Sequence, residues 1–137
     1  MFRRMLYILL LPAMLVASIA VSQAAQAQSP HFVGSQSCVS STSGSVTCSF
    51  SVSGLGNAQT ATASIQSPFE CVKITSHEVR PGGLASSGNQ TFAVRAGRID
   101  VSGLQLTASC PDSFAPDFTG PVTVIVNGQA VGTIPIT

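Results

Sequence analysis

Apolar and polar residues alternate along most of this chain. Residues 46–53 read VTCSFSVS, with an apolar side chain at every second position and Ser or Thr between them. A period of two predicts a β-strand that is buried on one face and solvated on the other. We expect further strands, with no competing helical pattern, over 35–41, 60–66, 71–79, 91–95, 98–108, 122–126 and 129–136.

Short turn sequences separate the predicted strands. Asn127-Gly128 is the strongest hairpin signal, because both residue types tolerate the positive φ of a type I′ turn. Gly103 lies where the apolar positions change parity, which predicts a β-bulge or a strand that crosses between sheets. We also expect a strand end at Ser67-Pro68 and tight connections at Thr42-Ser43-Gly44, Gly54-Leu55-Gly56-Asn57 and Arg80-Pro81-Gly82-Gly83.

This pattern predicts an all-β domain. Seven to eight short strands with frequent turns are typical of a small immunoglobulin-like antiparallel β-sandwich, and a small closed barrel is the alternative. We place this domain at 36–137 and expect 28–35 to be a flexible lead-in, because it is polar and interrupted by proline and glycine. Residues 111–121, with three prolines, are expected to form a long loop.

The first 27 residues have the form of a signal peptide. Arg3 and Arg4 precede an apolar run, and Ala25-Gln26-Ala27 matches a small-residue cleavage site. A retained membrane anchor is the alternative, but Pro12 interrupts the apolar run. Cleavage after Ala27 leaves 137 − 27 = 110 residues and no membrane span in the mature chain. We therefore expect a secreted, periplasmic or cell-surface protein.

Four cysteines in an exported chain predict two disulfides. A hairpin centred on Ser43 places Cys38 directly opposite Cys48, at a separation that a disulfide spans. Cys71 and Cys110 remain as the second pair. A zinc site is disfavoured, because the chain has no Cys-x-x-Cys pair and its two histidines lack ligand spacing.

Charge and aromatic content exclude several classes of function. After cleavage, four basic and five acidic residues leave a net charge of −1 without any charged block, which argues against nucleic acid and against an electrostatic membrane anchor. Neither Trp nor Tyr remains in the mature chain, which disfavours a carbohydrate-binding surface. We expect no cofactor and no metal.

The order of short motifs suggests a relationship. Cys38, Gly54-Leu55-Gly56-Asn57, Cys71 and Cys110-Pro111 follow one another before a last strand rich in Val, Thr and Ile. This pattern resembles a group of small exported bacterial proteins of uncharacterised function. The resemblance implies an exported compartment and this fold, and it implies no particular chemistry.

The sequence favours a non-catalytic structural or protein-binding module over an enzyme. His77-Glu78 is the only His–carboxylate neighbour pair, and on a strand its side chains would point to opposite faces. There is no Gly-x-Ser-x-Gly motif. The alternatives are a secreted hydrolase inhibitor that acts through the 111–121 loop, or a small enzyme. For contact with a partner protein, or for self-association through the edge of a strand at 122–126, we expect Phe114, Phe118, Val122 and Val124.

Overall fold

A computed structural model describes residues 29–41 and 44–137 of the chain. The predicted signal peptide, and Thr42 and Ser43 of the first predicted turn, lie outside these residues. The described residues form nine strands: β1 (His31–Ser40), β2 (Ser45–Ser53), β3 (Thr60–Lys73), β4 (Val79–Ser86), β5 (Gln90–Ala93), β6 (Ile99–Thr107), β7 (Phe114–Phe118), β8 (Val122–Val126) and β9 (Gln129–Ile134).

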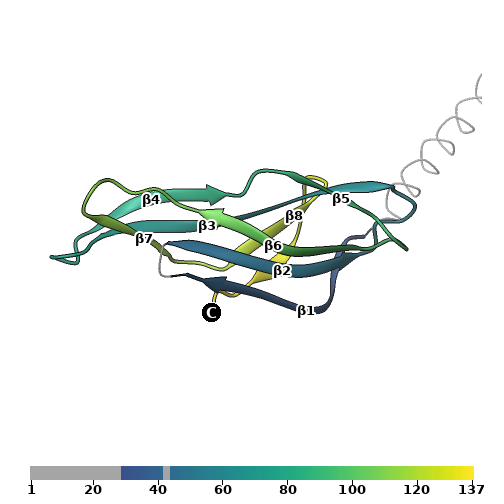
Figure 1. Cartoon of the computed structure of the whole chain (residues 1–137), viewed down its shortest axis with the longest axis horizontal. Coiled ribbons are helices and arrows are strands. Elements are labelled where there is room, and N and C mark those ends of the chain that lie inside the picture. The colour runs from purple at the N-terminus through teal and green to yellow at the C-terminus, as the bar shows by residue number, and fades with distance from the viewer. Residues whose placement is uncertain (1–28, 42–43) are drawn as a thin grey trace, which may run out of the picture.

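The strands form two antiparallel sheets (Figure 1). One sheet has the order β1-β2-β6, and the other is organised around β3. On one side β3 pairs first with β5 and then with β4, and on its other side it pairs with β8 and then with β7. β9 pairs with the outer side of β8. The predicted all-β antiparallel sandwich is confirmed, with nine strands rather than seven to eight.

The first hairpin has the predicted register. Cys38 on β1 is the direct partner of Cys48 on β2, and a disulfide joins them with Cα atoms 4.1 Å apart. The prediction of a flexible lead-in is wrong from His31 onward, because β1 begins there. The Phe32 ring packs edge to face against Phe50, with ring centroids 6.1 Å apart, and this contact holds the start of β1 on β2.

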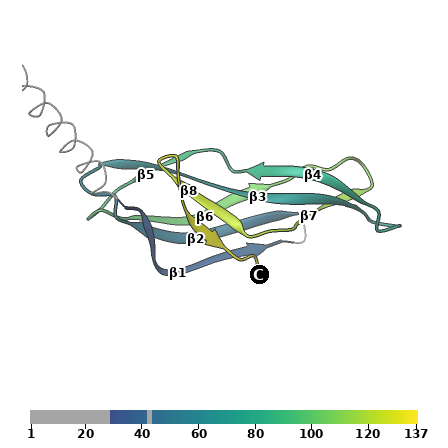
Figure 2. The same ribbon diagram turned by 180° about the vertical axis from the view of Figure 1, so that it is seen from behind.

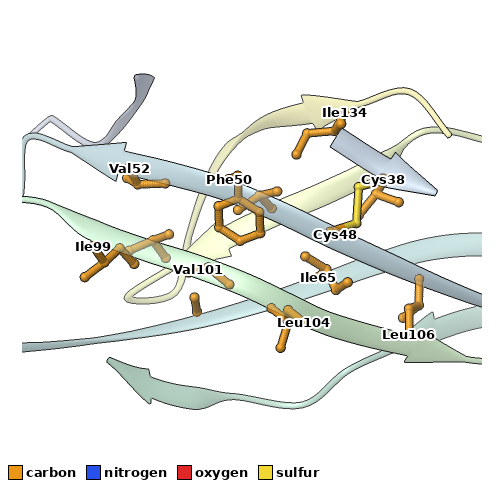
Figure 3. Close-up of a cluster of buried hydrophobic side chains, with 14 of the residues drawn as sticks. Cys38, Cys48, Phe50, Val52, Ile65, Ile99, Val101, Leu104, Leu106 and Ile134 are labelled. Carbon is orange, nitrogen blue, oxygen red and sulfur yellow. A yellow bond between two sulfur atoms is a disulfide. The ribbon is translucent and has the colours of Figure 1, made fainter. Parts of the chain in front are cut away.

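The core lies between the two sheets and is filled by the alternating apolar residues (Figure 3). From the three-stranded sheet, β2 and β6 contribute most of the buried side chains. From the other sheet, β3, β8 and β9 contribute Ala, Val and Ile. The largest side chains that are fully buried include Leu55, Ile65, Ile99, Leu106 and Ile134.

Two local predictions about turns and bulges are confirmed. Gly103 has φ of 73° at a register shift between β2 and β6, so that apolar residues on both sides of it point into the core. Asn127 and Gly128, with φ of 50° and 80°, join β8 to β9 in the manner of a type I′ turn.

Two predicted interruptions are instead parts of strands. β3 continues through Pro68, because this residue lies where β3 passes from pairing with β8 to pairing with β7. The predicted turn at 80–83 lies within β4. There Gly82 is an extra residue in the register, and it packs so closely on Phe69 that no side chain would fit.

The predicted long loop at 111–121 is also wrong in its centre. Residues 114–118 form β7, which pairs with 69–73 of β3. The second disulfide, Cys71–Cys110, has Cα atoms 5.7 Å apart and ties the chain just before β7 to the same stretch of β3. Long-range pairing with β3 therefore orders a segment whose own sequence has the composition of a loop.

Candidate binding surface

The β3–β4 hairpin and β7 form a three-stranded extension of the larger sheet. We call this part the arm, and it consists of 68–73 of β3, 79–84 of β4 and all of β7. The tip of the β3–β4 hairpin reaches beyond the ends of β1 and β2 (Figures 1 and 2). The arm therefore has an inner face directed toward the other sheet and an outer face directed away from it.

The register assigns each residue of the arm to one of these faces. Directly paired residues of antiparallel strands share a face, and alternate residues of one strand share a face. Cys71 is buried on the inner face, so Glu70 and Val72 lie on the outer face. Pro68 lies on the outer face for the same reason. The outer arm face comprises these three residues and their partners on β4 and β7: Pro68, Glu70, Val72, Val79, Pro81, Leu84, Ala115 and Asp117.

Apolar side chains are exposed on the outer arm face. Val79 is 54% exposed and Leu84 is 59% exposed, although both belong to regular strands. Val72, which is directly opposite Val79, is half-buried. Ile74, just past the end of β3, is 68% exposed. Among the described residues, the one other large apolar side chain exposed to this degree is Val39 on β1, so these side chains are concentrated on one hairpin.

Two carboxylates lie between the apolar residues of this face. Glu70 on β3 and Asp117 on β7 are direct partners in the register. Within the part of the chain that the structure describes, neither carboxylate is within ion-pair distance of a basic side chain. The nearest basic residues along the arm, Lys73 and Arg80, belong to the inner face, because their partners are Phe114 and Cys71. The outer arm face therefore has a negative centre.

Phe114 and Phe118, two of the predicted contact residues, lie on the inner arm face and are half-buried. The Arg80 guanidinium lies 4.8 Å from the centroid of the Phe114 ring. The Phe118 ring packs on Phe69, with centroids 6.2 Å apart. Both rings thus have partners within the molecule, and the segment that carries them does not project as a loop for insertion into a cleft.

Val122 and Val124, the other two predicted contact residues, are fully buried. They lie on β8, which pairs with β3 on one side and with β9 on the other. The expectation of an exposed edge at 122–126 is therefore wrong, because β9 covers one edge of β8 and β3 covers the other.

The strands that do form edges within the described residues are each short or interrupted. β5 has only four residues. The outer side of β1 has a bulge between Val33 and Ser37 and is hydrogen-bonded to Thr137 at Cys38 and Ser40. The other interruptions are Pro81 with Gly82 in β4, Gly103 in β6, Pro116 in β7, and a bulge near Val131 in β9. Prolines and bulges prevent a further strand from pairing along a sheet edge. Side-chain contact with a face of the arm is therefore favoured over strand addition.

The Gly54-Leu55-Gly56-Asn57 segment closes the other end of the sandwich. Leu55 is buried, and its N–H donates to the Gly97 carbonyl oxygen over 3.0 Å. Gly54 has φ of 84°, and its backbone packs against the carbonyl of Ser29. A shallow hollow lies beside this segment and is lined by small and uncharged residues, which include Asn57 and Gln59. These contacts give the segment a structural role.

The ionisable groups of the described residues are spread over the molecule. Among the residues outside the undescribed stretches, no three His, Cys, Asp or Glu side chains are grouped so that they could hold a metal ion. His31 lies at the start of β1 and His77 lies in the β3–β4 turn, which are opposite ends of the molecule (Figure 1). Hydrogen bonds from Ser51 and Arg98 hold the pKa of Asp100 below its ordinary value of 3.8. Ser51, Arg98 and Asp100 thus form an exposed contact between β2 and the start of β6.

No protein-family model, curated protein or solved structure matches this chain. Over residues 29–41 and 44–137, no helix is long and apolar enough to cross a membrane.

The sequence analysis missed Val79, Leu84 and the acidic pair. The available signal is the parity of β3: on a strand continuous from Ile65, the even-numbered positions point away from the core. Because the sequence analysis expected the strand to end at Pro68, the alternation was not followed from Ile65 to Val72. The position of Asp117 opposite Glu70 has no signal in the sequence, because it depends on a pairing between distant segments.

Proposed function

We propose that this protein is an exported, non-catalytic, immunoglobulin-like domain that binds another protein through the outer arm face. The two disulfides are consistent with an oxidising extracellular environment, and they support export. The two antiparallel sheets and the size of the domain support the immunoglobulin-like assignment.

The observation that carries the proposal is the exposure of Val79 and Leu84 on ordered strands. Single exposed apolar residues are common, but a group of them on one rigid face marks an interaction site. Here two such side chains, Val79 and Leu84, share one face with the half-buried Val72 within paired strands, and the disulfide Cys71–Cys110 holds the arm that presents them. The backbone of this face is ordered in advance, which reduces the entropy lost on binding.

Affinity capture from the native exported fraction tests the proposal. We expect the immobilised, oxidised protein to retain a specific protein, and the double variant Val79→Ser/Leu84→Ser to lose it. Val39→Ser is the matched control, because Val39 is 52% exposed but lies on β1 of the other sheet. Circular dichroism would verify that all three proteins are folded. Equal retention by the double variant, or no specific retention by the native protein, would contradict the proposal.

A further inference from the structure

We infer that the outer arm face binds an extended protein segment in which a basic side chain lies between two apolar side chains at alternate positions. This inference rests on the proposed function, because it specifies what the same face recognises. It follows from the order of side chains along β3 and from the charge of the central row.

The outer arm face is built of three rows across the strands. Pro68 on β3 is opposite Leu84. Two residues further along, Glu70 lies between Pro81 on β4 and Asp117 on β7, so the central row contains both carboxylates. The next row contains Val72 and Val79. Two residues of a strand span about 6.7 Å, so apolar, acidic and apolar rows follow one another at that spacing. Alternate side chains of an extended segment laid along β3 have the same spacing and would meet the rows in turn.

The acidic row lacks a basic partner within the described part of the molecule. Direct cross-strand partners have Cβ atoms roughly 4.5–5.5 Å apart, and like charges at that distance disfavour the folded state. No ion pair with a basic side chain relieves the repulsion between Glu70 and Asp117. An arginine or lysine supplied by a partner would interact favourably with both carboxylates, and the fork of an arginine can donate to two acceptors at once.

The same charge argues against other occupants. Two copies of this chain placed face to face here would bring four carboxylates together, and an anionic lipid surface would also be repelled. A strand added to the edge of β4 would meet Pro81 and the bulge at Gly82. The occupant that fits both the apolar rows and the acidic row is an extended segment that runs along β3, with one basic side chain between two apolar side chains.

Nuclear magnetic resonance titration of the oxidised protein tests this inference with two synthetic peptides. The first is acetyl-Thr-Val-Thr-Arg-Thr-Val-Thr-amide, and the second has Glu in place of Arg. We expect the arginine peptide to shift backbone amide resonances of the arm, and the glutamate peptide to bind at least about tenfold more weakly. Binding should weaken with added salt, because the carboxylates are accessible to ions.

Variants that remove charge without changing shape provide the second measurement. Glu70→Gln and Asp117→Asn should each lower the affinity for the arginine peptide by roughly two- to fivefold, as expected from the loss of an exposed ion pair. Both should also raise the melting temperature, because the cross-strand repulsion is relieved. Asp112→Asn, an exposed acid outside the face, is the matched control and should change neither property.

Equal binding of the two peptides, shifts that map outside the arm, or no shift at millimolar peptide would overturn the inference. Unchanged peptide affinity of Glu70→Gln and Asp117→Asn would do the same. If the native partner is lost by Val79→Ser/Leu84→Ser but kept by both charge variants, the proposed function stands and this inference fails. If neither set of variants loses that partner, both fail.

Discussion

Cys38 and Cys48 are direct cross-strand partners in the β1–β2 hairpin, and their disulfide lies completely buried in the core. The covalent bond therefore joins two strands that already hydrogen-bond to each other. Cys71–Cys110 differs from it, because it ties β3 to the chain that enters β7 from β6.

We expect both disulfides to be required for stability. In the chain-entropy description, the sequence separations of 10 and 39 residues correspond to about 3 and about 4 kcal/mol. Together they are comparable with the roughly 5–15 kcal/mol that stabilises a typical domain, so full reduction should unfold the protein. Thermal melts followed by circular dichroism with and without reductant check this, and identical melting curves would contradict it.

The two bonds should also be distinguishable. Replacing Cys71 and Cys110 by Ser should first loosen β7 and the arm, whereas replacing Cys38 and Cys48 should destabilise the core as a whole. Hydrogen exchange measures the difference residue by residue. The first variant should exchange faster at the amides of β7 while β2 stays protected. Uniform acceleration in both variants would show that the arm and the core unfold together.

Val124→Lys should destabilise the protein severely. Val124 is fully buried between β3 and β9, and a lysine there would bury an ammonium group without a partner. We expect a loss of about 3 kcal/mol or more in the free energy of unfolding. Thr123→Lys is the control, because the adjacent residue points to the outer side of the sheet. Urea denaturation of both variants checks the prediction, which requires a much smaller loss for Thr123→Lys.

Asp100 should add a small pH-dependent stabilisation. Its carboxylate accepts hydrogen bonds from Ser51 Oγ and from Arg98 Nε, which lower its pKa in the folded protein. A lowered pKa means that the stabilisation is fully present above the unfolded value and is lost as the pH falls through the folded value. Asp100→Asn should therefore be slightly less stable than the native protein at pH 7 and equally stable below the folded pKa. Denaturation curves of both proteins, recorded from pH 7 down to below the folded pKa, test this prediction. A difference in the free energy of unfolding that stays constant with pH would argue against it.

Local patterns predict the local parts of this fold. The spacing around Ser43 predicts the pairing of Cys38 with Cys48, and Asn127-Gly128 predicts the β8–β9 turn. The parity change at Gly103 predicts the bulge in β6. Each of these features depends on backbone preferences and alternation within about a dozen residues.

Features that depend on distant pairing could not be predicted in the same way. Residues 114–118 look like a loop because Pro116 lies among them, yet β3 pairs with them as β7. Val122 and Val124 look like an edge because the local hairpin with β9 covers only one side of β8, and the other side is covered by the distant strand β3. The candidate surface combines both effects, since the outer arm face exists only because β4 and β7 flank the far half of β3.

The interrupted edges of the two sheets have a consequence for how this protein behaves at high concentration. Continuous backbone edges allow identical chains to stack into fibres as concentration rises. Here prolines and bulges oppose such stacking, while disulfides oppose the partial opening that would expose new strands. We expect a domain built in this way to resist edge-to-edge stacking of its sheets even at high local concentration.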